Sequence, residues 1–132
     1  MSIANVKDFY TRCSSLENEM LIIKFGADWC APCNAIKNVV QQELDKSEKN
    51  IIFIDLDIDE NIEIYGHFKT KRLVSGIPAM LAFVKPDEDI MERLSPALIS
   101  DSVSGANQVK IRDFFGRCNK KAKSINNNIS YL

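Results

Sequence analysis

Long apolar runs are missing from this sequence, and their absence excludes one class of protein at once. No hydrophobic stretch approaches the about 20 residues that a bilayer-spanning helix needs, so we expect no membrane partner. Residues 1–8 lack a basic start followed by an apolar block and do not resemble a secretory signal. We therefore expect a cytoplasmic protein.

An excess of charge of one sign is also missing. The chain has 17 Lys and Arg against 18 Asp and Glu, a formal net charge of -1 over 132 residues. This balance gives no reason to expect nucleic acid as a partner. The apolar fraction of 45% and charged fraction of 27% are ordinary for a globular protein with a buried core. The length suits one domain, and nothing requires more than a monomer.

Cysteine and histidine are scarce. The cysteines are Cys13, Cys30, Cys33 and Cys118, too few for a disulfide-dense secreted scaffold. A structural zinc site needs four ligands, and the only histidine, His67, does not complete one with Cys30 and Cys33. We expect no metal and no cofactor. Cys13 and Cys118 lie on apolar helical stripes and are predicted to be buried packing residues, while His67 is predicted to be a helix-surface residue.

The apolar pattern predicts alternating helices and strands. Helical spacing predicts helices across residues 3–13, from Cys30 through 44, 62–68 and 111–122. Buried strands are predicted at 21–25, 51–58 and 79–84, with a short strand at 101–104. This order predicts an α/β fold with a central mixed β-sheet sandwiched by helices. We assign residues 1–123 to this domain and predict a mobile tail at 124–132.

The segment Trp29-Cys30-Ala31-Pro32-Cys33 carries the chemistry. A C-x-x-C pair beside strand–helix patterning indicates redox function. Only a thiolate attacks a disulfide, and unpaired N–H groups at a helix start would favour the thiolate of Cys30. The spacing brings Cys33 close enough to attack a mixed disulfide at Cys30, so release becomes intramolecular. Pro32 stiffens the turn that sets this distance.

Three features in order resemble the thioredoxin family over most of the chain, to about Cys118. They are the segment Phe25-Gly26-Ala27-Asp28-Trp29-Cys30-Ala31-Pro32-Cys33, then Gly76-Ile77-Pro78, then Gly105 before the last helix. The resemblance implies a thioredoxin fold and a thiol–disulfide oxidoreductase that reduces disulfides in protein substrates. It also implies that Cys30 is the nucleophile and Cys33 the resolving thiol.

The resemblance further implies how substrates and a reductase meet this site. Trp29 would wall the active site, although a simple packing role is the alternative. Pro78 would follow a cis peptide bond facing the cysteines, so that the backbone of Ile77 can pair with an extended substrate segment. The alternative for Pro78 is a proline at the start of a strand. The partner that restores the dithiol would be a flavin-containing thioredoxin reductase.

The sequence departs from the family at two charged positions. The family usually has a buried aspartate where this chain has Lys24, and a nearby lysine where it has Asp55. We expect a partly buried Lys24–Asp55 ion pair beneath the active site, because an unpaired charge in an apolar run is costly. A cationic Lys24 would favour the reduced state, whereas a neutral one could accept a proton. The alternative places the ammonium in water, with Asp55 solvated.

Two other classes of function stay open on the sequence alone. One is an interaction module that keeps the fold and offers a docking surface, although docking does not require both thiols. The other is an oxidase-like or isomerase-like protein, which the Lys24 exchange favours. The connection 85–100 is longer than the tight hairpin of a minimal thioredoxin, and we expect it to be a surface insertion.

Overall fold

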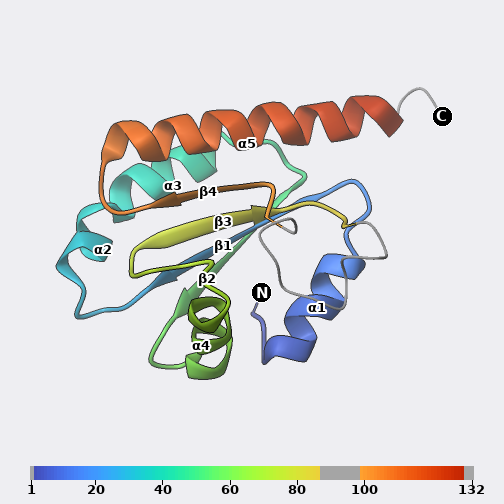
Figure 1. Cartoon of the computed structure of the whole chain (residues 1–132). Helices are drawn as coiled ribbons and strands as arrows, with labels where there is room; N and C mark the ends of the chain where they lie inside the picture. The colour runs from blue at the N-terminus through green and yellow to red at the C-terminus, as the bar shows by residue number, and fades with distance from the viewer. Residues whose placement is uncertain (1, 87–98, 130–132) are drawn as a thin grey trace.

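A four-stranded mixed sheet forms the centre of the computed structural model, which describes residues 2–86 and 99–129. The strands are β1 (Met20–Gly26), β2 (Ile51–Asp57), β3 (Ala79–Phe83) and β4 (Asp101–Ser104). Their order is β2-β1-β3-β4, with β1 parallel to β2 and antiparallel to β3, and β4 antiparallel to β3 (Figure 1). This confirms the predicted mixed sheet. Most of the connection 85–100 lies outside the described residues.

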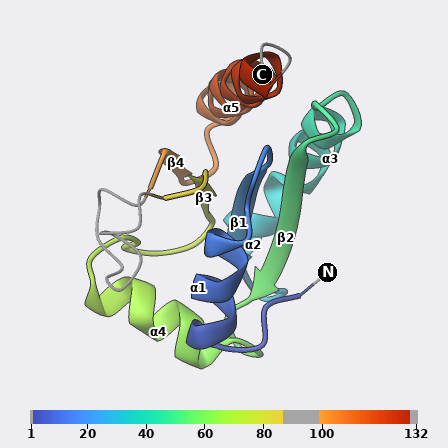
Figure 2. The same cartoon turned by 90° about the vertical axis from the view of Figure 1, so that its right-hand side faces the viewer.

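Helices cover both faces of this sheet, as predicted. Figure 2 shows α1 (Val6–Ser14) and α4 (Ile62–Thr70) on one face, and α3 (Lys37–Asp45) and α5 (Gln108–Ile129) on the other. All residues of β1 are buried, which follows from its central position between two helical layers. Among the described residues, no helix is both long enough and apolar enough to cross a bilayer.

The core is divided by the sheet into two apolar clusters. Successive β1 side chains point to opposite faces. Leu21, Ile23 and Phe25 therefore join the cluster under α1 and α4, whereas Met20 and Ile22 join the cluster under α3 and α5. By the same alternation Lys24 follows Ile22 on the α3/α5 face, where the apolar row of β1 ends. The fold thus places one lysine at the active-site end of its central strand.

Cys13 and Cys118 lie in different clusters. Cys13 belongs to the α1/α4 cluster and Cys118 to the α3/α5 cluster, so the sheet separates them. Both are free and buried, which confirms that they are packing residues. Burial raises the pKa of each thiol to about 12, and for Cys118 the Asp101 carboxylate adds to the effect.

Two predicted helices differ from the observed ones. The helix expected from Cys30 through 44 is divided into α2 (Ala31–Ala35) and α3, with the buried Ile36 between them. No Pro or Gly lies at this break, so the sequence carries no signal for it. In α4, where the apolar spacing of 62–68 predicted the helix, the buried residues are Ile64 and Phe68, and Ile62 is exposed. The i, i+4 pair forms the buried face, and Ile62 in the first turn points away from it.

The last helix is longer than predicted. It continues to Ile129 and includes part of the segment 124–132 that was assigned to a tail. Just before this segment, the helix contacts the loop that precedes β2. Asn50 Nδ2 donates to the Ala122 carbonyl at 2.8 Å, and Lys123 Nζ lies 4.0 Å from Glu48 Oε1. Residues 130–132 lie outside the described part, and the mobility of the tail stays a prediction.

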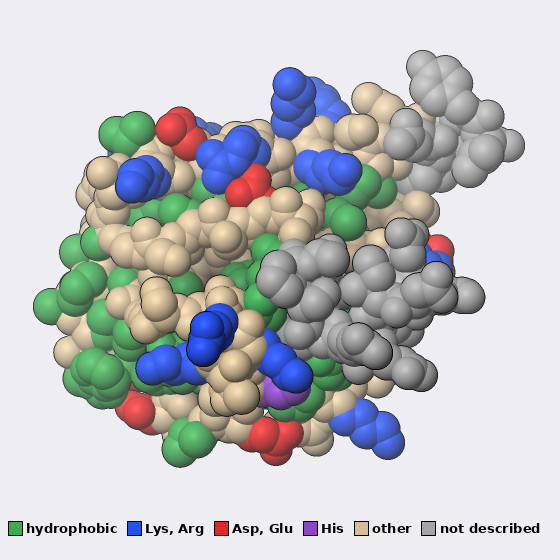
Figure 3. All heavy atoms as spheres, in the orientation of Figure 1, with side chains coloured by type: hydrophobic (Ala, Val, Ile, Leu, Met, Phe, Trp, Pro, Cys, Tyr) green, Lys and Arg blue, Asp and Glu red, His purple; other side chains and the backbone are tan. Residues whose placement is uncertain are grey.

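The surface carries charges of both signs. On the face shown in Figure 3, Lys, Arg, Asp and Glu side chains are interspersed, and hydrophobic side chains gather at the left edge, beside the end where α2 lies. Across the described residues the exposed large hydrophobic side chains are Trp29, Ile62 and Val109. One of these three, Trp29, immediately precedes the C-x-x-C pair.

Candidate active site

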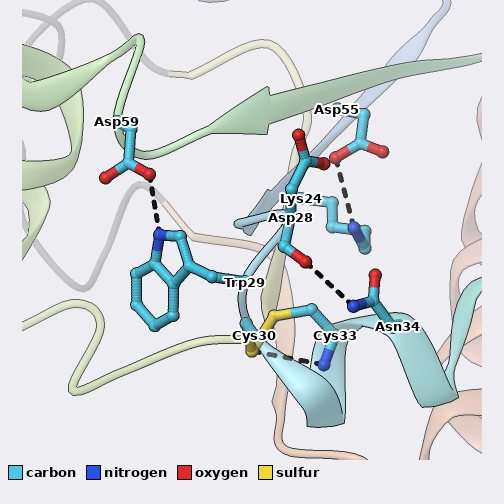
Figure 4. Close-up of a disulfide and its surroundings, with 8 residues drawn as sticks. All are labelled: Lys24, Asp28, Trp29, Cys30, Cys33, Asn34, Asp55 and Asp59. Atoms are coloured by element: carbon cyan, nitrogen blue, oxygen red, sulfur yellow. Dashed lines mark hydrogen bonds and ion pairs between the residues drawn. A yellow bond between two sulfur atoms is a disulfide. The ribbon is translucent and has the colours of Figure 1, made fainter.

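Cys30 and Cys33 lie at the junction between β1 and α2 and form a disulfide (Figure 4). Cys30 has an extended backbone (φ -87°, ψ 107°) and is the N-cap of α2, so the helix begins beside it as predicted. Pro32 lies in the first turn, where its fixed φ suits a helix and its missing N–H costs no hydrogen bond. The two Cα atoms are 5.2 Å apart, well within the range that a disulfide spans.

The backbone around Cys30 favours a negative charge on its sulfur. The Cys33 N–H donates to Cys30 Sγ at 3.2 Å, as a capping side chain accepts from the third residue of a helix. A hydrogen bond from a backbone N–H stabilises a thiolate more than a thiol, because the acceptor carries the charge. Cys30 is 6% exposed and Cys33 is 2% exposed, so Cys30 is the more accessible residue of the pair. The pair can therefore alternate between a disulfide and a dithiol with one reactive thiolate.

Trp29 lies beside this pair on the surface. It is 67% exposed, which excludes the alternative of a simple packing residue. Its indole Nε1 donates to Asp59 Oδ2 at 2.7 Å, and Figure 4 shows the ring held between the cysteines and the loop before α4. Asp59 lies two residues before Asn61, the N-cap of α4. The separation of Trp29 and Asp59 in the sequence left no signal for their contact.

The Ile77–Pro78 peptide bond is cis, as predicted. Pro78 is buried immediately before β3, and the Gly105 N–H donates to its carbonyl at 2.9 Å. Gly105 has φ 85°, a conformation that glycine adopts without strain. Ile77 is half-buried and packs against the small cluster of Ala27, Cys30 and Cys33. The loop before β3 is thus brought next to the disulfide, where the prediction placed it.

Lys24 and Asp55 form the predicted ion pair. They lie directly opposite each other in the parallel β1–β2 register, and Lys24 Nζ donates to Asp55 Oδ1 at 3.2 Å. Lys24 is only 5% exposed, so the alternative with its ammonium in water is wrong. The Asp55 side chain is 61% exposed, as the second part of that alternative expected, so only one end of the pair is buried. The buried end is the positive one.

Lys24 and Cys33 approach each other across Gly26. A Cβ atom on Gly26 would lie 3.2 Å from Lys24 Nζ and 3.6 Å from Cys33 Sγ. The ammonium and the sulfur therefore flank the same small space, and any residue larger than glycine would crowd them. An open cleft of about 630 Å³ reaches this place, and Lys24, Gly26, Cys33 and Asp55 are among the residues that line it. The sequence did not predict this role for Gly26.

One further contact holds the site together. Asn34 Nδ2 donates to the Asp28 carbonyl at 2.9 Å and ties α2 to the loop that carries Trp29. Sequence reasoning missed Asn34, because nothing in the motif distinguishes it from a surface residue. Within residues 2–86 and 99–129, no group of three His, Cys, Asp or Glu side chains is arranged to hold a metal ion.

A redox-active cysteine pair at the start of the helix after β1, in a mixed sheet of this order, defines a thiol–disulfide oxidoreductase. The family model described as Thioredoxin matches residues 1–105. The chain belongs to the thioredoxin family.

Curated relatives agree with this assignment. The chain is 30% identical to Thioredoxin 3 of Plasmodium falciparum (isolate 3D7) over 83% of its own length and 54% of that protein. The match thus spans about half of this relative. It is 25% identical to thioredoxin of Gallus gallus over 85% of this chain and 91% of that one. The second match extends over nearly the whole of that thioredoxin.

Solved structures show the same fold. The oxidised thioredoxin from Plasmodium falciparum superposes with a TM-score of 0.62 at 20% identity, covering 89% of this chain and 96% of that one. Thioredoxin from Malassezia sympodialis gives a TM-score of 0.65 at 20% identity, covering 88% and 89%. At this level of identity the likeness concerns the fold, and the chemistry of the site rests on the residues described above.

Proposed function

We propose that this protein reduces disulfides in protein substrates, with Cys30 as the nucleophile and Cys33 as the resolving thiol. The observation that carries the proposal is the Cys33 N–H hydrogen bond to Cys30 Sγ within a disulfide-bonded pair. That bond favours the thiolate on the more accessible cysteine, and the thiolate is the attacking species in disulfide exchange. The pairing with Cys33 supplies the second thiol.

The reaction proceeds in two exchange steps. The Cys30 thiolate attacks one sulfur of the substrate disulfide, a Cys30–substrate bond forms, and the other substrate sulfur leaves as a thiolate that takes up a proton. Cys33 then loses its proton and attacks Cys30 Sγ. The Cys30–Cys33 bond forms and the mixed disulfide breaks, releasing the second substrate thiol. Two electrons have passed from the protein dithiol to the substrate disulfide.

The surroundings of the pair suit an extended protein segment. The exposed Trp29 ring lies on one side of Cys30, and Ile77 packs against the cysteines from the loop before β3. An extended chain beside Ile77 would pair with its backbone as an added strand. Hydrophobic side chains at this end, visible at the left of Figure 3, would contact apolar residues that flank the substrate disulfide.

We further propose a cytoplasmic monomer that a flavin-containing thioredoxin reductase returns to the dithiol state. The balanced charge and the lack of a long apolar helix in the described residues are compatible with this setting. The reductase has to reach the same Cys30–Cys33 disulfide, and the exposed Trp29 side of the pair offers that access.

The test is insulin reduction coupled to NADPH consumption by a thioredoxin reductase. We expect turnover by the wild type and none by Cys30→Ser. Cys33→Ser should accumulate a mixed disulfide with insulin, because attack still occurs but release does not. Cys13→Ala is the matched control, since it removes a buried thiol outside the site. A mixed disulfide trapped on Cys30→Ser instead, or a folded wild type without turnover, would overturn the proposal.

One observation favours a second candidate, an oxidase-like or isomerase-like protein. The buried Lys24 ammonium lies near Cys33, and a positive charge there stabilises thiolates and thus the reduced state. A pair stabilised in its reduced state accepts electrons more readily. The equilibrium reduction potential against glutathione separates the two. A strongly reducing value supports the reductase, and a value close to those of oxidising isomerases supports the alternative.

A further inference from the structure

We propose that Lys24 is a positioning residue for disulfide exchange: its ammonium holds a positive charge beside Cys33 and favours the thiolate of that sulfur, while Asp55 limits the strength of this effect. The proposal deepens the function above and rests on Cys33 as the thiol that closes the disulfide. It concerns the step in which Cys33 has to lose its proton.

The geometry brings the two groups to one place. Nζ of Lys24 and Sγ of Cys33 lie 3.2 and 3.6 Å from the point where a Cβ on Gly26 would be. Both atoms therefore border the space in front of the Gly26 Cα, and they lie no more than about 7 Å apart. An ammonium has three N–H donors, so the bond to Asp55 leaves donors that can turn toward the sulfur.

The ion pair does not cancel the charge at Cys33, because its two ends differ in environment. Lys24 is 5% exposed, whereas the Asp55 side chain is 61% exposed. Water and salt screen the exposed carboxylate more strongly than the almost fully buried ammonium. The ammonium therefore contributes more to the potential at the sulfur than the Asp55 carboxylate does.

Most of the other charged groups near Cys33 are exposed to water. The charged residues that line the cleft are Lys24, Asp28, Lys37, Asp55, Asp57 and Glu60. Asp57 is half-buried, and Asp28, Lys37, Asp55 and Glu60 are exposed. Lys24 is the buried member of this set, so its charge reaches Cys33 with the least screening. The exposed acids weaken the effect without reversing it.

The cleft also gives the proton a way out. It is open to solvent and reaches Cys33, so water can take the thiol proton directly. Cys33 then attacks Cys30 Sγ, the Cys30–Cys33 bond forms, and the bond from Cys30 to the substrate breaks. The substrate sulfur leaves with the electron pair and takes a proton from water. In this step Lys24 acts through its charge and lowers the free energy of the thiolate.

The experiment measures the Cys30–Cys33 equilibrium with glutathione as a function of pH for the wild type and three variants. Lys24→Met removes the charge and keeps the stem, Lys24→Arg keeps the charge, and Asp55→Asn removes the exposed partner. At acid pH, where the thiols are protonated, all four proteins should agree. At about pH 9 Lys24→Met should favour the disulfide by about tenfold, which is about 30 mV more reducing.

The other two variants test the direction in which charge shifts the equilibrium with glutathione. Lys24→Arg should follow the wild type, and Asp55→Asn should shift the opposite way from Lys24→Met. A merely structural role would shift the equilibrium equally at every pH. The proposal is overturned if Lys24→Met matches the wild type at all pH values, or if Asp55→Asn shifts in the same direction as Lys24→Met. Should Lys24→Met not fold, the direction of the Asp55→Asn shift alone decides.

Failure of this proposal and failure of the proposed function are distinguishable. The glutathione equilibrium needs no protein substrate, so the Lys24 effect can be present in a chain that does not reduce insulin. Conversely, the protein could reduce insulin while its reduction potential is the same with and without the Lys24 charge. The reductase function would then stand, and Lys24 would have no part in it.

Discussion

Two pairs of cysteines in this chain have opposite chemistry although both are almost completely buried. Cys30 and Cys33 are 6% and 2% exposed, and Cys13 and Cys118 are 1% exposed each. Exposure therefore separates the pairs only slightly. What differs is the set of neighbours. Cys30 accepts a backbone N–H and Cys33 lies near an ammonium, whereas Cys13 and Cys118 lie in apolar clusters on opposite faces of the sheet.

The reactive cysteines lie at the C-terminal end of the central strand β1, and not beside its middle. Along β1 the side chains on the α3/α5 face change from Met20 and Ile22 to Lys24. The same strand thus begins in a core and ends beneath a redox pair. A thiol that packs in the apolar core around the first part of β1 stays protonated. A thiol near the C-terminal end of β1 lies close to hydrogen-bond donors and to a positive charge.

Alkylation should show the largest difference between the pairs. Burial raises the pKa of Cys13 and Cys118 to about 12, so their thiolate fraction at neutral pH is about 10⁻⁵. Iodoacetamide on the reduced, folded protein should modify Cys30 at least about a thousandfold faster than either of them. Peptide mass spectrometry after timed quenching measures the rates.

The control is the same reaction in denaturant, where all four cysteines should react at similar rates. If Cys13 in the folded protein is alkylated as fast as Cys30, the proposed difference between the two pairs is wrong, because burial then does not protect the thiol.

Alkaline unfolding should show a smaller difference. The folded-state pKa values of Cys13 and Cys118 are raised from 9.0 to about 12. Their protonated form is thus favoured by folding, and the stability that this contributes is complete below about pH 9 and is lost as the pH rises toward 12. Across this window the free energy of unfolding should fall with a slope of at most about 1.4 kcal/mol per pH for each thiol.

Alanine variants isolate this contribution. Cys13→Ala and Cys118→Ala should each cost about 1 kcal/mol at neutral pH from the lost packing, but their stability should fall less steeply between about pH 9 and 12. Urea titrations across this range measure both effects. Parallel curves for wild type and variants would show that other groups, such as lysines, cause the alkaline loss.

Much of this organisation was predictable because it depends on local periodicity. The apolar run 21–25 predicted a doubly buried strand, and Lys24 within it predicted a partner on the adjacent strand. Asp55 is that partner because parallel pairing places the two residues opposite each other. The cis bond before Pro78 was implied by the resemblance of the Gly76-Ile77-Pro78 segment to the thioredoxin family, and local periodicity alone does not encode it.

Other features depend on how distant loops meet, and no periodicity encodes them. The break at Ile36 occurs without a Pro or Gly. The approach of Lys24 and Cys33 across Gly26 requires the exact path of the chain from β1 into α2. The Trp29–Asp59 contact requires the loop before α4 to reach the loop before α2. These tertiary contacts are the part of the site that the structure adds.

The Trp29–Asp59 hydrogen bond gives the smallest expected effect and the finest test of the site. Because the contact is exposed, Asp59→Asn should lower the free energy of unfolding by about 1 kcal/mol or less. Its main consequence should be local: the indole loses a charged acceptor and becomes free to move beside Cys30. Trp29 is the only tryptophan, so fluorescence reports this site alone. We expect a shifted emission maximum and lower anisotropy in Asp59→Asn, with insulin turnover reduced severalfold through weaker substrate binding.

Glu60→Gln, which changes a neighbouring exposed acid, is the matched control and should leave the fluorescence unchanged. If both variants change the emission equally, the general acidity of this loop, and not the hydrogen bond to Asp59, orients Trp29 at the active site.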